Sequence, residues 1–520
     1  MRRALFIGLM AAVAGCAAGD SGPGRAGNGA QGGGAGGQTI GGSGGATAGR
    51  GGGGATGGAG APGGMAGTQG GGGNSGTSGS SGAGGAGGAG GAGGAGGGAG
   101  SVGSGVPSGD PILDRLTTKD VTVPAGVKAG VRNWRIWDSV MLKVAPVYTV
   151  PLANCGTLIC YTSGSSGSPN AHAVRLDASD ALVETIDLGA GLECRGIAAE
   201  PDGHFAALLW SNTSDQIWVK RYDLAGAEQF STELTNADNH PTDFGLGEGR
   251  LEFGDGQYGA YYHVHSDSGH EGDTLKFVTA ATGAEETEWA WGCSHSMSNL
   301  LTYSEAANSF LPTCVTDCYP GTEGSSFATT SIGGIYTDNR RKVLDVAAGC
   351  NGDVAGELGG AAVASSGWKL VFNAHRGPVT LGQDSYDPDS MNQDIVFASI
   401  ATDHMPAGPV VWLTDTSAIN EADSAMARWQ PAGDDAEQYI VGWLEPTPSP
   451  TYKLSRVDPA GTILEGPIDV TAKAHWGERD DPFRTHVNGD IVWAWFDAAG
   501  ATTLKLARLR SDGMAQCAPF

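Results

Sequence analysis

The chain has 520 residues, of which 90 are glycine, and a formal net charge of −25 at pH 7. This charge disfavours binding to nucleic acid or to an anionic lipid surface, because both are polyanions. The length is sufficient for a large core, and no apolar segment reaches the ~20 residues that a membrane-spanning helix requires.

Residues 1–15 predict an export signal, because the basic start Met1-Arg2-Arg3 precedes a short apolar stretch. The sequence Val13-Ala14-Gly15-Cys16 resembles the bacterial lipobox. In that family the cysteine thiol receives a diacylglycerol, the signal is removed, and the new amino terminus is acylated. The resemblance implies a lipid anchor at Cys16. Ala17 stands where an aspartate tends to retain lipoproteins at the inner membrane, which implies the outer membrane or cell surface. The alternative is an ordinary signal peptide with an incidental cysteine.

Residues 16–106 predict a disordered tether that begins at the lipidated cysteine. The first 110 residues hold 49 of the 90 glycines and none of the 13 tryptophans. Such a segment buries too little apolar surface to offset its ordering entropy. As a flexible coil it spans roughly 50 Å, with a taut limit of about 300 Å. We therefore expect it to hold the following domain away from the lipid surface.

Eight further cysteines predict disulfide bonds, since an even number in an exported chain favours them. The alternative is a zinc site that uses Cys293, Cys314 and Cys318, or reduced buried thiols. Spacing alone does not fix the pairing. The eight residues are Cys155, Cys160, Cys194, Cys293, Cys314, Cys318, Cys350 and Cys517.

A ten-residue pattern recurs at residues 217–226, 452–461 and 504–513, and looser copies begin near residues 171, 275, 327 and 395. It places an arginine before an Asp-Gly turn. A second glycine turn between apolar runs precedes the pattern, as at Pro201-Asp202-Gly203 and Asn488-Gly489-Asp490. Glycine turns between apolar runs predict hairpins. Each unit therefore predicts four antiparallel strands.

These units predict an all-β fold, a β-propeller of seven four-stranded blades at residues 151–520. Residues 107–150 are expected to supply a lead-in or a closing strand. The hairpin followed by Gln216-Ile217-Trp218-Val219 resembles the blades of TolB-like propellers, as does the segment 392–397. The resemblance is at blade level and identifies no single family. The alternative is a β-sandwich or two smaller β domains.

The segment 263–273 holds the densest group of residues suited to chemistry. His263 and His265 are two apart on a predicted strand, so their side chains point the same way. With His270 they suit zinc or a similar divalent metal. The alternatives are calcium bound by the carboxylates of the segment, proton transfer by a histidine, or a structural role for the histidines. The acidic segment 384–394 is either a second calcium site or a solvated loop.

In a propeller, the connections between second and third strands share one face with those between successive blades. Several polar residues are expected to meet at this face and to form a binding site. They are His240, Asp243, His263, His265, Asp267, His270, Glu271, Asp273, His295, His375 and Arg376.

We expect a monomeric, lipid-anchored binding protein of the envelope or cell surface that recognises a protein, peptide or glycan. The alternatives are a metal-dependent hydrolase or lyase at the histidine-rich face, and a structural envelope component. The sequence contains no Gly-x-Ser-x-Gly, phosphate-loop or His-Glu-x-x-His motif, and sialidase Asp-boxes are not evident. Catalytic residues are therefore not assigned, and binding is favoured over catalysis.

Overall fold

The structure is a computed structural model that describes residues 111–135, 138–142, 144–211, 213–234, 249–265, 271–294, 298–315, 334–337, 341–345, 356–376, 392–417, 419–431, 436–477, 479, 481–512 and 517. Within these ranges the strands form seven four-stranded antiparallel sheets and one separate hairpin. Five of the predicted site residues lie outside the described residues, namely His240, Asp243, Asp267, His270 and His295.

Three sheets precede residue 300, and in each of them strands that follow one another in the chain are neighbours. They comprise β4 (Tyr148–Pro151), β5 (Thr157–Ser165), β6 (Ser168–Leu176) and β7 (Leu182–Ala190); β8 (Glu193–Ala199), β9 (Phe205–Ser211), β10 (Gln216–Tyr222) and β11 (Glu228–Glu233); and β12 (Arg250–Gly254), β13 (Gln257–His265), β14 (Glu271–Thr279) and β15 (Glu285–Ser294).

Three more sheets follow with the same strand order. They comprise β16 (Asn299–Ser304), β17 (Ser309–Val315), β18 (Gly334–Thr337) and β19 (Arg341–Asp345); β20 (Gly356–Ala364), β21 (Gly367–Ala374), β22 (Asp394–Ala401) and β23 (Val411–Trp412); and β24 (Ala422–Trp429), β25 (Gln438–Glu445), β26 (Thr451–Val457) and β27 (Ile463–Asp469).

The last sheet joins the two ends of the described chain. It combines β28 (Arg484–Thr485), β29 (Ile491–Trp495) and β30 (Thr503–Leu509) with β1 (Leu116–Thr122). β1 pairs with β30 from Leu116↔Leu509 to Thr122↔Thr503. The segment 107–150 thus contains a closing strand, and it also contains the hairpin of β2 (Gly130–Arg135) and β3 (Asp138–Leu142).

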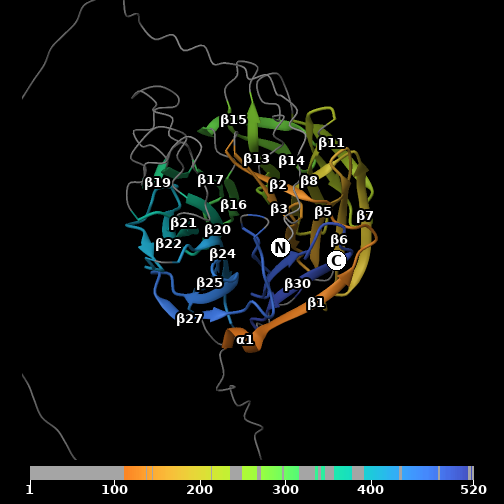
Figure 1. The fold of residues 1–520 in the computed structure, drawn as a ribbon. Coiled ribbons are helices and arrows are strands. Elements are labelled where there is room, and N and C mark those ends of the chain that lie inside the picture. The colour runs from red at the N-terminus through yellow and green to blue at the C-terminus, as the bar shows by residue number, and fades with distance from the viewer. Residues whose placement is uncertain are drawn as a thin grey trace, which may run out of the picture. The chain divides into compact units, whose positions relative to one another are not determined.

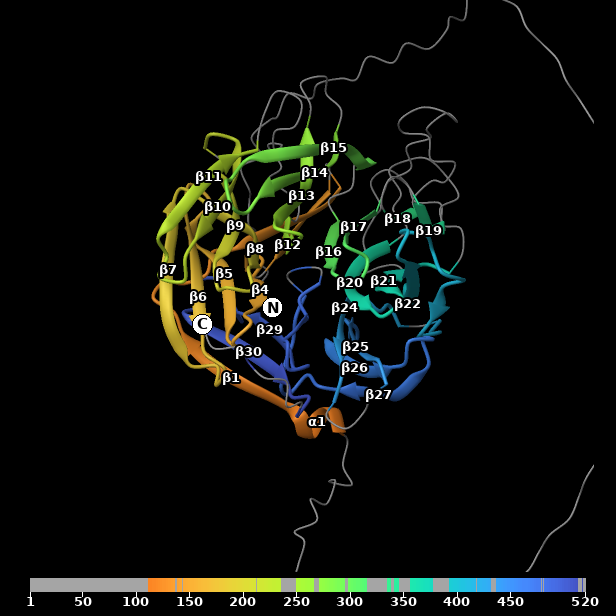
Figure 2. The ribbon, with the colours of Figure 1, turned by 180° about the vertical axis from the view of Figure 1, so that it is seen from behind.

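The first strands of the sheets contact one another in order around a ring, from β4 through β8, β12, β16, β20, β24 and β28 back to β4. Figures 1 and 2 show the sheets arranged around a common centre, with later strands of each sheet farther out. The prediction of an all-β β-propeller is confirmed, and the sandwich alternative is wrong. The physical reason is that each twisted sheet buries both faces against its neighbours.

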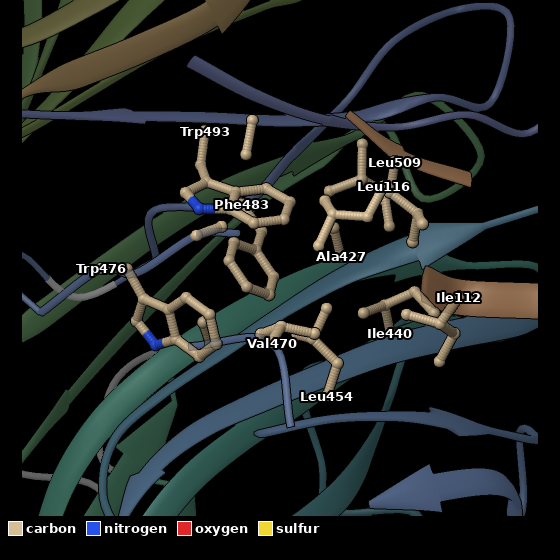
Figure 3. Packing of buried hydrophobic residues seen from close by; sticks show 14 of the residues in the cluster. Ile112, Leu116, Ala427, Ile440, Leu454, Val470, Trp476, Phe483, Trp493 and Leu509 are labelled. Atoms are coloured by element: carbon tan, nitrogen blue, oxygen red, sulfur yellow. The ribbon is translucent and has the colours of Figure 1, made fainter. Parts of the chain in front are cut away.

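Apolar side chains fill the space between neighbouring sheets. Figure 3 shows the cluster between the last two sheets, where Trp493, Phe483 and Trp476 pack near Leu454. Ile112, in the short helix α1 (Pro111–Arg115), is fully buried in the same cluster. The chain is therefore held in the core from the first residues that the structure describes. No helix in the described ranges combines the length and apolar character needed to cross a membrane.

The recurrent aspartate of the ten-residue pattern fixes the turn between third and fourth strands. Asp223 Oδ1 accepts hydrogen bonds from the backbone N–H groups of Ala225 and Ala227, each at 2.9 Å. Asp177 and Asp458 make the corresponding pair of bonds in two other sheets. The aspartate therefore recurs in the sequence because each of these turns needs the hydrogen bonds that its side chain accepts.

Two disulfides are described. Cys155, between β4 and β5, is bonded to Cys517, and Cys160 of β5 is bonded to Cys194 of β8 in the next sheet. Cys314 is also disulfide-bonded. The prediction of disulfides is confirmed for these cysteines. The zinc alternative is wrong for Cys314, because a disulfide sulfur is not a thiolate ligand.

A buried ion pair joins the last sheet to the first. Arg508 of β30, whose side chain is 1% exposed, donates through Nε to both carboxylate oxygens of Asp180 at 3.1 Å. Asp180 lies in the turn between β6 and β7, so the pair crosses the point where the ring closes. Arg508 also lies 3.4 Å from Asp490. This arrangement fixes the guanidinium by charge as well as by hydrogen bonds.

We predict that Asp180→Asn lowers the free energy of unfolding by about 3 kcal/mol, because Arg508 stays buried and loses a charged partner. Asparagine tolerates the left-handed φ of 62° at this position. The matched control is Asp512→Asn, at φ 55°, whose pair with Arg115 is solvent-exposed. The control is expected to lose less than about 1 kcal/mol. Equal losses for both variants in urea denaturation would contradict the prediction.

Candidate functional site

The strands of each sheet alternate in direction, so the connections fall on two rims. We call the rim where β4, β8, β12, β16, β20, β24 and β28 begin the loop rim, and the opposite one the turn rim. Connections at the turn rim are short, such as 255–256 and 365–366, whereas those at the loop rim include 234–249, 316–333 and 375–393. Long connections on a rigid scaffold are where binding residues concentrate.

His263 and Asp273 lie side by side near the loop rim, as register partners on β13 and β14. The His263 Nδ1 atom is 3.5 Å from Asp273 Oδ1, and both side chains are fully buried. Tyr261 donates its hydroxyl hydrogen to Asp273 Oδ2 at 3.2 Å. The pair is therefore held between strands and is not presented to solvent.

The other predicted site residues of this segment are only partly described. His265 and Glu271 are register partners at the loop-rim ends of β13 and β14. Of the proposed metal ligands His263, His265 and His270, only the His263 side chain belongs to the described structure. The described residues contain no group of three His, Cys, Asp or Glu side chains that could hold a metal. The zinc and calcium hypotheses thus remain predictions.

His375 and Arg376 follow β21 at the loop rim. His375 Nδ1 lies 3.0 Å from the Asn392 carbonyl oxygen, so we assign the ring hydrogen to Nδ1. Burial lowers the pKa of His375, which favours the neutral ring. Arg376 donates through Nε to Asp394 at 2.6 Å, and its guanidinium lies over the Trp412 ring. Arg376 is 38% exposed, so it presents a positive charge at the rim.

Beside these residues lies a buried group of polar side chains that we call the Gln393 cluster. It consists of Asn373, His375, Gln393, Glu421 and Ser424, from β21, β24 and the ends of adjoining connections. The Asn373 amide donates to Gln393 Oε1, and Ser424 donates to Asn373 Oδ1 at 3.2 Å. The Glu421 N–H donates to the Gln393 carbonyl at 3.0 Å. The cluster thus bridges two neighbouring sheets.

Three side-chain atoms of the cluster lack a hydrogen-bond partner among the described residues: His375 Nε2, Gln393 Nε2 and Glu421 Oε2. Buried polar atoms are normally paired, and an unpaired one indicates a site for water, an ion or a ligand. With its hydrogen on Nδ1, His375 offers an acceptor, and Gln393 offers a donor. The cluster can therefore bind a polar group that both donates and accepts hydrogen bonds.

Glu421 can change its charge near neutral pH. Its side chain is fully buried, and desolvation raises the pKa of its carboxyl group to about 7. Asp394 and Glu445 add repulsion, whereas a hydrogen bond from Thr416 at 2.7 Å opposes the shift. Carboxyl groups with perturbed pKa values are concentrated at functional sites.

A second cluster lies where the inner strands begin. Asp481 accepts hydrogen bonds from Arg479 at 2.8 Å and Arg484 at 2.7 Å, and lies 3.4 Å from Arg250 of β12. The Asp481 N–H donates to the carbonyl of Gly359 in β20. The segment 481–484 thus contacts β12 and β20 and continues into β28, so it links three sheets where their inner strands begin. These contacts indicate a structural role for Asp481.

His375 and Arg376 were predicted from the sequence, whereas Asn373, Gln393 and Glu421 were not. A polar residue directly before an apolar strand, as in Gln393-Asp394-Ile395 and Glu421-Ala422, was the signal available. It has little specificity alone, because many strands begin with a solvated polar residue. Only the packing of neighbouring sheets shows that these side chains are buried together.

Comparisons with known proteins identify no family. No family model and no curated protein matches the sequence. Among solved structures, the β-propeller domain of the Trilobed protease from Pyrococcus furiosus is 10% identical, with a TM-score of 0.38 and coverage of 72% of this chain and 98% of that one. A Dyadobacter fermentans protein of unknown function is 7% identical, with a TM-score of 0.37 and coverage of 76% and 100%. Trypanosoma rangeli sialidase is 10% identical, with a TM-score of 0.35 and coverage of 74% and 75%.

We predict that Glu421→Gln removes part of the pH dependence of stability. The folded-state pKa of about 7 lies above the ordinary glutamate pKa of 4.5, so ionisation destabilises the folded state progressively as pH rises from 4.5 through 7. Relative to the variant, the wild type should lose about 2 kcal/mol between pH 5 and pH 7.5. Denaturant unfolding at both pH values measures this difference.

The control for this measurement is Glu305→Gln, since Glu305 is exposed. Its unfolding free energy should follow the wild type at both pH values. A Glu421→Gln protein whose stability varies with pH as the wild type does would show that the carboxyl group titrates normally.

Proposed function

We propose that this chain is a lipid-anchored envelope protein whose seven-bladed propeller binds a polar ligand at the loop rim. The observation that carries the proposal is the Gln393 cluster, where buried hydrogen-bonding atoms lack partners among the described residues. Because these atoms are buried, a hydroxyl or amide group of a protein segment, peptide or glycan must displace the covering side chains at the loop rim to reach them. The seven four-stranded sheets and their closed ring of inner strands support the blade count.

The position at which the described chain enters the propeller supports the proposal of an upstream lipid anchor. The described part begins at α1, where Ile112 N–H donates to Glu465 and Lys473 donates to the Leu113 carbonyl. β1 then starts at the turn rim, since its first residue, Leu116, pairs with the last residue of β30. The described chain therefore begins at the turn rim, opposite the loop rim at which the ligand is proposed to bind. The disulfides are consistent with an oxidising compartment outside the cytoplasm.

A second function, a hydrolase or lyase, is favoured by one observation. A carboxyl group with a pKa of about 7, as at Glu421, suits proton transfer near neutral pH. In that case a substrate bound at the loop rim would be converted and not only retained. Recovery of the bound compound unchanged after prolonged incubation would support binding alone.

The ligand proposal can be tested with the full mature protein on arrays of peptides and glycans. We predict that Glu421→Gln and His375→Gln each lower the affinity for a ligand identified on the arrays by at least ~10-fold. This is the effect of about one lost hydrogen bond to a buried group. Glu184→Gln, in an ion pair with Arg175 on another sheet, should bind as the wild type does. Wild-type affinity in both cluster variants would place the ligand elsewhere.

The anchor can be tested separately. We predict that Cys16→Ser abolishes incorporation of a labelled fatty acid and moves the protein from the membrane to the soluble fraction, because the serine hydroxyl does not replace the thiol that is modified. Ser21→Ala, just beyond the cysteine, is the control and should keep both label and membrane association. A Cys16→Ser protein that remains labelled would refute lipidation at this residue.

A further inference from the structure

A cavity of about 390 Å³ opens between the sheet β12–β15 and the sheet β16–β19, away from the Gln393 cluster. Its position follows from its lining. Asp255 and Gln257 flank the start of β13, and Asn308 and Ser309 flank the start of β17, so the cavity lies toward the turn rim. The volume is within the range of about 300–1,000 Å³ that is usual for small-molecule sites.

Three aromatic side chains form a continuous apolar surface in this cavity. The Phe277 and Phe310 ring centroids are 5.2 Å apart, and those of Tyr303 and Phe310 are 4.8 Å apart. All three rings are partly exposed. Aromatic rings in a core are normally covered, so their joint exposure in a concavity indicates a surface for a ligand.

Two glycines hold the rings in place. A Cβ atom on Gly254 would lie 2.1 Å from the Tyr303 ring, and one on Gly259 would lie 3.1 Å from Phe310. The rings therefore rest directly against the backbone of the neighbouring sheet, where a larger residue at Gly254 would displace Tyr303 and one at Gly259 would crowd Phe310. This packing fixes the aromatic surface before a ligand binds, which reduces the entropy lost on binding.

Polar groups surround the aromatic surface. The Tyr303 hydroxyl donates to Asn308 Oδ1 at 2.7 Å, and Ser309 Oγ lies 3.0 Å from His404 Nε2. The Gln257 amide donates to Glu286 at 3.0 Å. The carboxylate of Asp255 lies in the lining, so an anionic ligand is disfavoured.

We infer that this cavity binds a neutral pyranose ring of a carbohydrate. A pyranose has an apolar face of C–H groups and hydroxyl groups around its edge. The three rings match the apolar face, and the amide, hydroxyl, carboxylate and imidazole groups around them match the hydroxyl edge. The site is separate from the Gln393 cluster and stands without the function proposed for it.

The test uses the full mature protein with methyl β-glucopyranoside, N-acetylglucosamine and choline as probes in titration calorimetry. A single-ring ligand is expected to bind with a Kd on the order of 1 mM. Gln257→Ala and Phe310→Ala should each weaken pyranoside binding by at least ~10-fold. Gln216→Ala is the matched control, because Gln216 likewise donates its amide to an exposed glutamate but lies on another sheet.

Unfolding temperatures of the variants separate misfolding from loss of the site. If Phe310→Ala does not fold, the pyranoside affinity of Gln257→Ala alone tests the inference. Gln257 lies at the cavity edge and is only partly buried, so its substitution is expected to leave the fold intact. Binding of choline without either sugar would overturn the inference and assign a cationic ligand. Absence of sugar binding at tens of millimolar, or wild-type affinity in Gln257→Ala, would also overturn it.

Discussion

The pairing of β1 with β30 joins strands whose residues are almost 400 positions apart in the chain, from Leu116↔Leu509 to Thr122↔Thr503. Without it the last sheet would have three strands, and β30 would become its unpaired outer edge. Arg508 of β30 and Asp180 of the first sheet add a buried charge pair at the same junction. The strand pairing and the ion pair together fix the last sheet against the first, and with it the point where the two ends of the described chain meet.

The features that could be predicted from the sequence are those that each unit specifies locally. Asp223 and Asp458 bind their own turns, and Arg221 of the same pattern pairs with Glu200 of its own sheet at 2.6 Å. Such residues recur because every sheet needs the same turn. The Gln393 cluster is different, because it forms only when β21 and β24 of adjacent sheets pack together. No local pattern distinguishes Gln393 or Glu421 from a solvated polar residue.

The two rims differ in chemistry. At the loop rim, buried amide, imidazole and carboxyl groups meet, and the pKa of Glu421 is raised to about 7. Between the sheets near the turn rim, Tyr303, Phe310 and Phe277 form an apolar surface with polar edges. One scaffold thus combines a desolvated cluster of hydrogen-bonding groups with an aromatic cavity. The Gln393 cluster and the aromatic cavity are formed by different strands and connections. Substitutions in the cluster are therefore expected to leave the cavity unchanged, and the reverse.

The chain enters the propeller next to the strand that closes it, and this has a mechanical consequence. β1 starts at the turn rim and runs antiparallel to β30, so tension from upstream of residue 111, directed away from that rim, acts along the strand axis. The pairs between β1 and β30 would then share the load in shear instead of separating one after another. Cys155–Cys517 covalently links the segment after β30 to the first sheet. A force applied along β1 in this direction would therefore be opposed by all seven residue pairs of the junction at once.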